Sequence, residues 1–176
     1  MKKIMMLLSV LLLSQTVALA SAEEDNAPAE QSISIVNSKG EEIGNAHLKQ
    51  QGSKVLIHLE AKGLTPGVHG IHFHAEGKCD TPDFKTAGDH FNPHHKQHGF
   101  KNPKGFHTGD LPNIKVNEDG TVTAMLESET ATLLPGKPNS LTKEGGTSLI
   151  IHEKADDYVT DPSGNSGARI ACGVIK

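Results

Sequence analysis

The chain has 176 residues, a formal net charge of −4 at pH 7, no tryptophan and one tyrosine. That length suits a single domain with a hydrophobic core. Because aromatic residues are scarce, we expect the core to be built from aliphatic side chains. No basic stripe occurs along the sequence, so we expect no nucleic acid partner. The two cysteines and eleven histidines are the residues that carry most of the chemical information.

The first twenty residues have the pattern of a secretory signal. Lys2 and Lys3 precede an apolar run over residues 4–13, and Ala-Leu-Ala at 18–20 provides the small residues that a signal peptidase accepts. The run is too short to span a bilayer comfortably, so we expect a signal peptide over 1–20, with an uncleaved anchor as the alternative. Cleavage would leave a secreted or envelope protein without stable membrane insertion. It would also move the net charge from −4 to −6, because two lysines are lost.

Residues 21–31 are small, polar and acidic, and are predicted to be a disordered lead-in to one domain over 32–176. The domain divides into short alternating apolar segments separated by glycine-containing turns, which is the pattern of antiparallel strands. We expect eight strands, over residues 31–38, 41–50, 53–61, 68–75, 112–117, 121–127, 147–152 and 168–175. No long segment has helical periodicity, so the predicted fold class is all-β, an antiparallel sandwich or barrel.

Two segments lack a strand pattern, residues 76–111 and residues 153–167. A loop of 36 residues is unusual in a compact domain unless something holds it. The first loop contains Cys79 and several potential metal ligands, so we expect a disulfide and metal ions to hold it. Cys79 can pair only with Cys172. An exported chain favours this bond, and two free buried thiols are the alternative.

Seven of the eleven histidines fall between residues 72 and 107. His72 and His74 are two positions apart on a predicted strand, so both imidazoles leave from the same face. Beside a histidine-rich loop, a metal site is favoured there over plain surface. His152 ends a strand far along the chain and could fold back toward this pair. A four-nitrogen imidazole set that includes these three histidines would suit Cu(II) better than magnesium or calcium.

The long loop carries a second group of ligand residues, three imidazoles and one carboxylate: His90, His98, His107 and Asp110. This group makes a complete tetrahedral zinc set with no open position, which is typical of a structural site. The remaining histidines are interpreted as structural or surface residues: His69 on the opposite strand face, His94 and His95 in solvent, and His47 and His58 as ordinary strand residues.

Five motifs, in this order and spacing, resemble those of the copper–zinc superoxide dismutases: HGIHFH at 69–74, GDHFNP at 88–93, HTGD at 107–110, IHEKADD at 151–157 and GNSGARIACG at 164–173. The resemblance covers essentially the whole chain after residue 31. It implies a Greek-key, eight-stranded antiparallel β-barrel of the immunoglobulin-like sandwich type with two long functional loops. It also implies an enzyme that converts superoxide to oxygen and hydrogen peroxide, with copper and zinc as cofactors.

Carried over by position, the resemblance implies two metal sites that share one residue. Copper would be bound by His72, His74, His90 and His152, and zinc by His90, His98, His107 and Asp110. His90 would bridge the two metals and carry a catalytic proton. Asp156 matches the carboxylate that links a copper histidine to a zinc histidine, and Arg169 matches the arginine that attracts and orients the anion beside copper.

Superoxide is therefore the expected partner, and a homodimer is compatible with the resemblance, although its interface is not identified. A non-catalytic copper or zinc carrier is the alternative, because a complete ligand set separates it from an enzyme only in part. An adhesion-type sandwich would not need these histidines. The loop from His152 to Arg169 is short and acidic, and Pro162 stands where the family often has a lysine. The residues that steer the anion are therefore not predicted in detail.

Overall fold

The computed structural model describes residues 29–176, so the predicted signal peptide and most of the predicted lead-in lie outside the described residues. Within this range the chain forms nine strands and one 3-10 turn: β1 (Glu30–Asn37), β2 (Glu42–Gln51), β3 (Lys54–Ala61), β4 (Gly67–His69), β5 (Ile71–His74), η1 (Lys85–Ala87), β6 (Ile114–Val116), β7 (Val122–Ser128), β8 (Thr147–His152) and β9 (Arg169–Ile175). β1 begins at Glu30, so the last two residues of the predicted lead-in belong to a strand. No helix among the described residues is long and apolar enough to cross a membrane.

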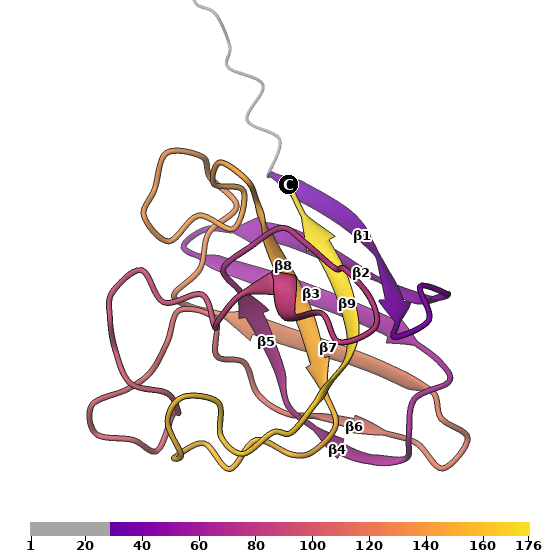
Figure 1. The fold of residues 1–176 in the computed structure, drawn as a ribbon. Helices are drawn as coiled ribbons and strands as arrows, with labels where there is room; N and C mark the ends of the chain where they lie inside the picture. Colours follow the sequence, from indigo (N-terminus) through magenta and orange to yellow (C-terminus); the bar gives the residue numbers. More distant parts are fainter. Residues whose placement is uncertain (1–28) are drawn as a thin grey trace, which may run out of the picture.

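Seven strands form one antiparallel sheet in the order β5-β8-β9-β1-β2-β3-β7, and β4 pairs with β6 in a separate two-stranded sheet (Figure 1). β1, β2 and β3 follow one another as neighbours, whereas β3 next pairs with β7, and β5 pairs with β8. These long connections are typical of a Greek key. The sheet curls around an apolar core, which confirms the predicted all-β Greek-key barrel class.

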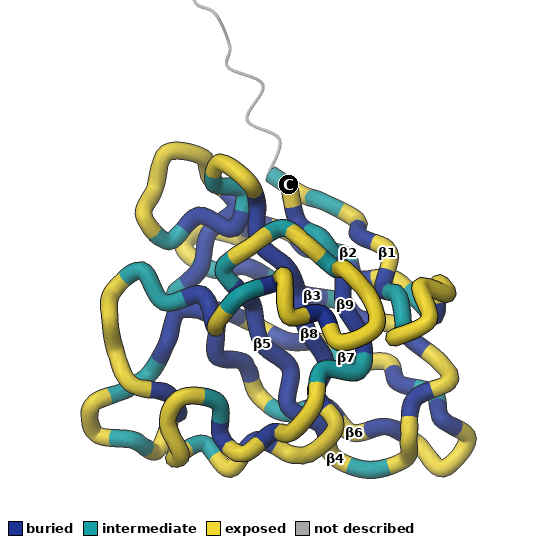
Figure 2. The backbone as a smooth tube through the Cα atoms, in the orientation of Figure 1, coloured by how far each residue is buried: buried dark blue, intermediate teal, exposed yellow. Residues whose placement is uncertain are grey.

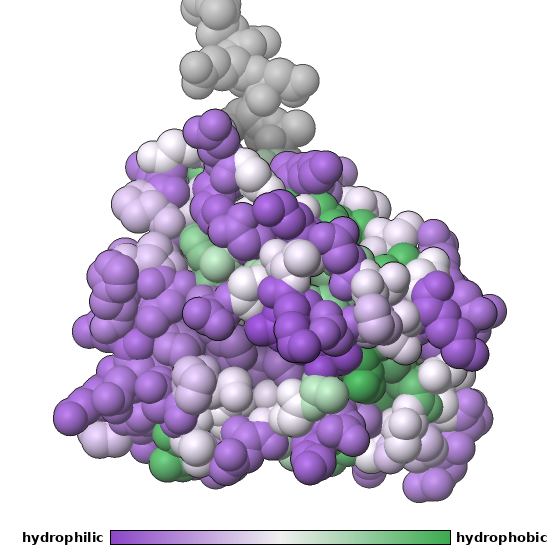
Figure 3. Space-filling view, in the orientation of Figure 1, coloured by the Kyte–Doolittle hydropathy of each residue, from purple (hydrophilic) through white to green (hydrophobic). Residues whose placement is uncertain are grey.

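The core is built from aliphatic side chains, as the composition requires. Along β3 the alternate residues Val55, Ile57 and Leu59 are fully buried, and each such burial stabilises the fold by about 1.5–3 kcal/mol. Figure 2 shows the buried chain concentrated in the strands at the centre, with exposed chain mainly in the loops. The face seen in Figure 3 is mostly hydrophilic, with only scattered hydrophobic residues.

The strand predicted over 68–75 is two strands, because the chain changes partners at Gly70. The Gly70 N–H donates to the carbonyl of Lys154, and its carbonyl accepts from the N–H of His152, both at 2.8 Å. A Cβ at Gly70 would lie 3.0 Å from the Ser166 side chain and 3.2 Å from the His72 ring. The close approach therefore favours glycine, and it brings the loop over 153–167 against the start of β5.

Backbone hydrogen bonds hold the loop over 76–111 against β5. The Phe73 N–H donates to the Gly109 carbonyl at 2.9 Å, and the Phe73 carbonyl accepts from the Phe91 N–H at 2.8 Å. A Cβ on Gly109 would lie 2.3 Å from the Phe73 carbonyl oxygen, so only glycine fits there without a shift. The loop therefore continues the sheet beside β5, although its sequence has no strand pattern.

The predicted disulfide is present and joins Cys79, near the start of the long loop, to Cys172 on β9. Cys172 is fully buried in a small cluster with Phe84, Ala87 and Ile150. The bond closes a sequence separation of 93 residues. It therefore attaches the first part of the long loop to the barrel wall.

Replacing both cysteines, in the Cys79→Ser/Cys172→Ser protein, should lower the free energy of unfolding by roughly 4–5 kcal/mol, the chain-entropy value for a closed loop of this size. Chemical denaturation measures the loss. Hydrogen exchange should accelerate in residues 76–91 while the amides of β2 and β3 keep their protection. Reduced wild-type protein is the matched control, and an equal loss of protection in every strand would contradict this prediction.

Candidate metal centre

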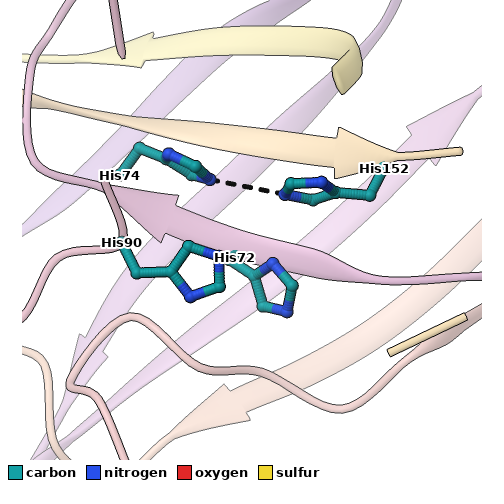
Figure 4. A group of neighbouring side chains, drawn as sticks. All are labelled: His72, His74, His90 and His152. Atoms are coloured by element: carbon teal, nitrogen blue, oxygen red, sulfur yellow. Dashed lines mark hydrogen bonds between the residues drawn. The ribbon is translucent and has the colours of Figure 1, made fainter. Parts of the chain in front are cut away.

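Four buried histidines from separate parts of the chain converge beside β5 and the end of β8: His72, His74, His90 and His152. One ring nitrogen from each lies within 4.8 Å of the other three. Figure 4 shows the four rings gathered together, with His74 Nε2 facing His152 Nε2 at 3.4 Å. The structure therefore brings together the four residues predicted from the sequence as one set.

Two nitrogens of this set, His72 Nδ1 and His90 Nε2, are buried and have no hydrogen-bond partner. Buried polar atoms in folded proteins almost always have one. A cation at the centre of the set would satisfy both, and imidazole nitrogens are ordinary ligands of copper and zinc. The residues present therefore fit a transition-metal ion.

β5 explains how the first two histidines reach this position. All four of its residues are buried, with Ile71 and Phe73 in the hydrophobic core. His72 and His74 consequently point to the other face, as predicted, and the long loop covers them there. A β-bridge between His74 and His90 places the loop histidine beside the strand pair.

The second ring nitrogen of each strand histidine is held by a fixed acceptor. His72 Nε2 donates to Asp156 Oδ2 at 2.8 Å, and His74 Nδ1 donates to the Gly88 carbonyl at 2.9 Å. Such bonds set the tautomer and the ring orientation. They leave His72 Nδ1 and His74 Nε2 as the ligand atoms.

A second buried set combines three imidazoles with one carboxylate: His90, His98, His107 and Asp110. Asp110 Oδ1 lies 2.9–3.4 Å from the Nδ1 atoms of all three histidines. The other carboxylate oxygen accepts the backbone N–H groups of Gly99 and His107, at 2.9 and 3.0 Å. Four converging donor atoms of these types are what a tetrahedral zinc site requires.

Burial makes most of these imidazoles hard to protonate. It lowers the pKa of His72 and of His90 to about 4, and the pKa of His152 to about 3. It also lowers the pKa of His74 well below its ordinary value. All four are therefore neutral at pH 7, which is the form that binds a metal ion.

His98 differs because two carboxylates contact its ring. Burial alone lowers its pKa, but hydrogen bonds and charge interactions with Asp110 and Asp156 outweigh burial and raise the pKa to about 9. Nδ1 faces Asp110 at 2.9 Å, and Nε2 donates to Asp156 Oδ1 at 3.0 Å. Carboxylates that favour a proton on this ring also favour a metal cation in the same place.

Asp156 is positioned by residues that the sequence did not single out. Its backbone N–H donates to the side-chain oxygen of Asn113, whose amide donates back to the Asp156 carbonyl, both at 2.9 Å. The Tyr158 N–H donates to Asp156 Oδ1 at 2.6 Å. A Cβ on Gly164 would lie 1.8 Å from the same oxygen. Of these residues, only Gly164 could be noticed in the sequence, because it begins the turn-like segment Gly-Asn-Ser-Gly.

Arg169 lies beside the first histidine set. Its Nη1 and Nη2 donate to the carbonyls of Phe84 and Gly88, both at 2.7 Å. After burial, its positive charge is one of the smaller causes of the lowered pKa of His74 and of His152. The guanidinium is half-buried and tied to the long loop, so its place is fixed.

Histidines outside the two ligand sets lie where the sequence predicted them, and one acidic residue has a role that was not predicted. His69 is buried, and its ring nitrogens lie 2.8 Å from the carbonyls of His152 and Thr65, whereas His94 and His95 are exposed. Asp161 was predicted only as part of an acidic loop. Its carboxylate accepts the backbone N–H of His98 at 2.6 Å, so it also supports the second set.

The comparisons with known proteins agree with this geometry. Residues 42–175 match the family model described as copper/zinc superoxide dismutase (SODC). The Cu-Zn superoxide dismutase 1 of Aquifex aeolicus (strain VF5) is 55% identical over 143 residues, 81% of this chain and 85% of that protein. The extracellular Cu-Zn superoxide dismutase of Brugia pahangi is 38% identical over 153 residues, 81% of this chain and 74% of that protein. The crystal structure of a SOD-like protein from Bacillus subtilis has a TM-score of 0.81 at 43% identity, covering 85% of this chain and 100% of that chain.

Replacing Asp156 by asparagine should weaken metal binding at both sets, because the same carboxylate orients His72 and His98. Loss of such an outer hydrogen-bond partner typically costs roughly 10- to 100-fold in metal affinity. Competition with a chromophoric chelator measures the affinity of the Asp156→Asn protein. Glu153→Gln removes a charge from the same loop without touching a histidine ring and serves as the control. Equal affinities for Asp156→Asn and wild type would refute the linking role.

Proposed function

This chain belongs to the copper/zinc superoxide dismutase family, and we propose that its buried histidine centre is where two superoxide anions and two protons become oxygen and hydrogen peroxide. The chain is an oxidoreductase that takes copper and zinc as cofactors. Copper would be held by His72, His74, His90 and His152, and zinc by His90, His98, His107 and Asp110. The two unpartnered nitrogens and the converging donors around Asp110 support this assignment.

The observation that carries the proposal is the position of His90 in both sets. Its Nδ1 lies 3.1 Å from Asp110 Oδ1, while its Nε2 is buried without a partner on the side of the first set. When bound, copper supplies the one-electron chemistry and zinc fixes the shared imidazole. An imidazole nitrogen readily holds and returns a proton. We therefore assign to His90 Nε2 the proton that product formation needs.

Arg169 favours an enzyme over a non-catalytic metal carrier. A guanidinium beside a copper set repels the metal cation, so it would weaken a site whose only task is to hold copper. The same charge attracts and orients an anionic substrate. Its two hydrogen bonds to the long loop keep it next to His74 and His152.

Removal of single ligands tests the assignment. His152 belongs to the first set only, so His152→Ala should lose copper and most superoxide consumption while zinc stays bound. His90→Ala should disturb both metals. Metal analysis combined with a superoxide assay of the copper-and-zinc-loaded and metal-free proteins measures both effects. His94→Ala, which replaces an exposed histidine outside both sets, is the control. Wild-type turnover in His152→Ala would show that the ligand assignment is wrong.

The charge of the molecule makes the anion's approach depend on a local field. The chain is net negative, and an open groove of about 500 Å³ beside His90 and His107 is lined by charges of both signs. Net charge therefore cannot attract superoxide. Local positive fields raise encounter rates by roughly 10- to 1000-fold, and salt screens them. Arg169 is the cation fixed beside the first set.

Arg169→Glu should therefore sharply lower the second-order rate with superoxide while both metals remain bound. Raising the ionic strength should slow the wild type and leave the variant unchanged or faster. Lys115→Glu, a charge reversal on an exposed position of β6, controls for the change in net charge. Equal rates and equal salt dependence for Arg169→Glu and wild type would remove Arg169 from the mechanism.

The proposal also includes the export of the protein and its association into a dimer. Some relatives are named extracellular, and residues 1–20 have a signal pattern, which together support export. Superoxide is the substrate, and association of two copies is proposed without an assigned interface. N-terminal sequencing of the mature protein and its sedimentation mass test these two points.

A further inference from the structure

A row of polar and soft side chains crosses the outer face of four neighbouring strands. The register pairs Ser32 with His47, His47 with His58, and His58 with Met125. The chain neighbours of both histidines on β2 and β3 are buried. Their own side chains are 41% and 42% exposed, so both imidazoles project outward from adjacent strands.

The sheet sets the separation of the two histidines. Directly opposed residues of an antiparallel pair have Cβ atoms about 4.5–5.5 Å apart. Two imidazoles at that separation can reach one metal ion, since metal–nitrogen bonds are about 2.0–2.1 Å long. β2 and β3 both lie inside the sheet, between β1 and β7 (Figure 1). The sheet, and not a loop, therefore fixes the two attachment points.

Each imidazole also has a carboxylate within reach. His47 Nε2 lies 3.6 Å from Glu30 Oε2, and His58 Nε2 lies 3.7 Å from Glu60 Oε1. In the register, Glu30 and Glu60 are on opposite sides of the row, so the two Nε2 atoms contact carboxylates on opposite sides. His47 Nδ1 also lies 3.0 Å from the Ser32 hydroxyl oxygen. Exposed histidine–carboxylate contacts of this kind, and an exposed hydrogen bond to a serine, contribute little to stability. A metal ion can therefore turn both rings toward each other at small cost and take one glutamate as an oxygen ligand.

We propose that His47 and His58 form a surface site for Cu(II), with Glu30 or Glu60 as the third ligand. A set of two imidazoles and one carboxylate binds Cu(II) more tightly than the other common divalent first-row ions. Met125, 67% exposed and opposite His58, adds a thioether at the edge of the site. None of these residues belongs to the two buried sets. The surface site can therefore fill and empty while the catalytic centre stays loaded.

Titration of the fully copper-and-zinc-loaded protein with CuCl₂ tests this site. Calorimetry should show one further equivalent of Cu(II) bound, and electron paramagnetic resonance should show a second, nitrogen-coordinated signal. His47→Asn and His58→Asn should each weaken this binding by roughly tenfold or more, about 1.4 kcal/mol per factor of ten. Superoxide consumption should remain at the wild-type level in both variants, which reports that they fold and keep their buried metals.

His94→Asn/His95→Asn is the matched control, because it removes two exposed histidines that are not on the sheet. This control protein should still bind one further equivalent of Cu(II). Binding that persists in the His47→Asn/His58→Asn protein, or that disappears in the control instead, would overturn the proposal. If the wild type bound no additional Cu(II), the proposal would also be overturned, and the row of side chains would be an ordinary solvated strand face.

Discussion

Asp156 is the residue on which the geometry of both ligand sets depends. Its two oxygens accept hydrogen bonds from His72 on β5 and from His98 in the long loop. Each bond fixes the tautomer of its histidine and turns the opposite nitrogen toward a metal position. Burial raises the pKa of Asp156, but the two imidazole hydrogen bonds outweigh burial and hold it well below the ordinary range. The carboxylate is thus ionised at neutral pH and orients one ligand of each set at once.

The barrel and the loops supply different parts of the centre. The sheet provides His72, His74 and His152, whose attachment points are set by the pairing of β5 with β8. The loops provide the other ligands, and they need further attachment because only isolated β-bridges pair them with β5. The disulfide, the Phe73 backbone and the Arg169 side chain give that attachment at three different places. The long loop is held because its two ends are bonded to the sheet and its middle is bonded to the second loop, as in the hydrogen bond from the Lys101 N–H to the Tyr158 carbonyl.

Sequence reasoning identified the parts whose signal is local. β8 has the predicted bounds, and the spacing of the histidines indicated which side chains the structure brings together. It did not predict the break at Gly70, because the change of partner there depends on Lys154, more than eighty residues away. Nor did it predict the role of Asn113, since that role exists only once two distant loops meet. The roles of individual ligands remain predictions from resemblance.

The buried centre and the His47–His58 row represent two different ways for a sheet to present imidazoles. In the first histidine set, burial keeps the four rings neutral and leaves two nitrogens without partners. Each unsatisfied buried group costs about 1–3 kcal/mol, so metal binding removes a cost that folding has already incurred. Loading and stability are consequently coupled there. On the outer face both rings are solvated and paired with glutamates, so folding incurs no such cost. A metal ion bound on that face would stabilise the folded chain only by mass action, to an extent set by its concentration relative to its Kd.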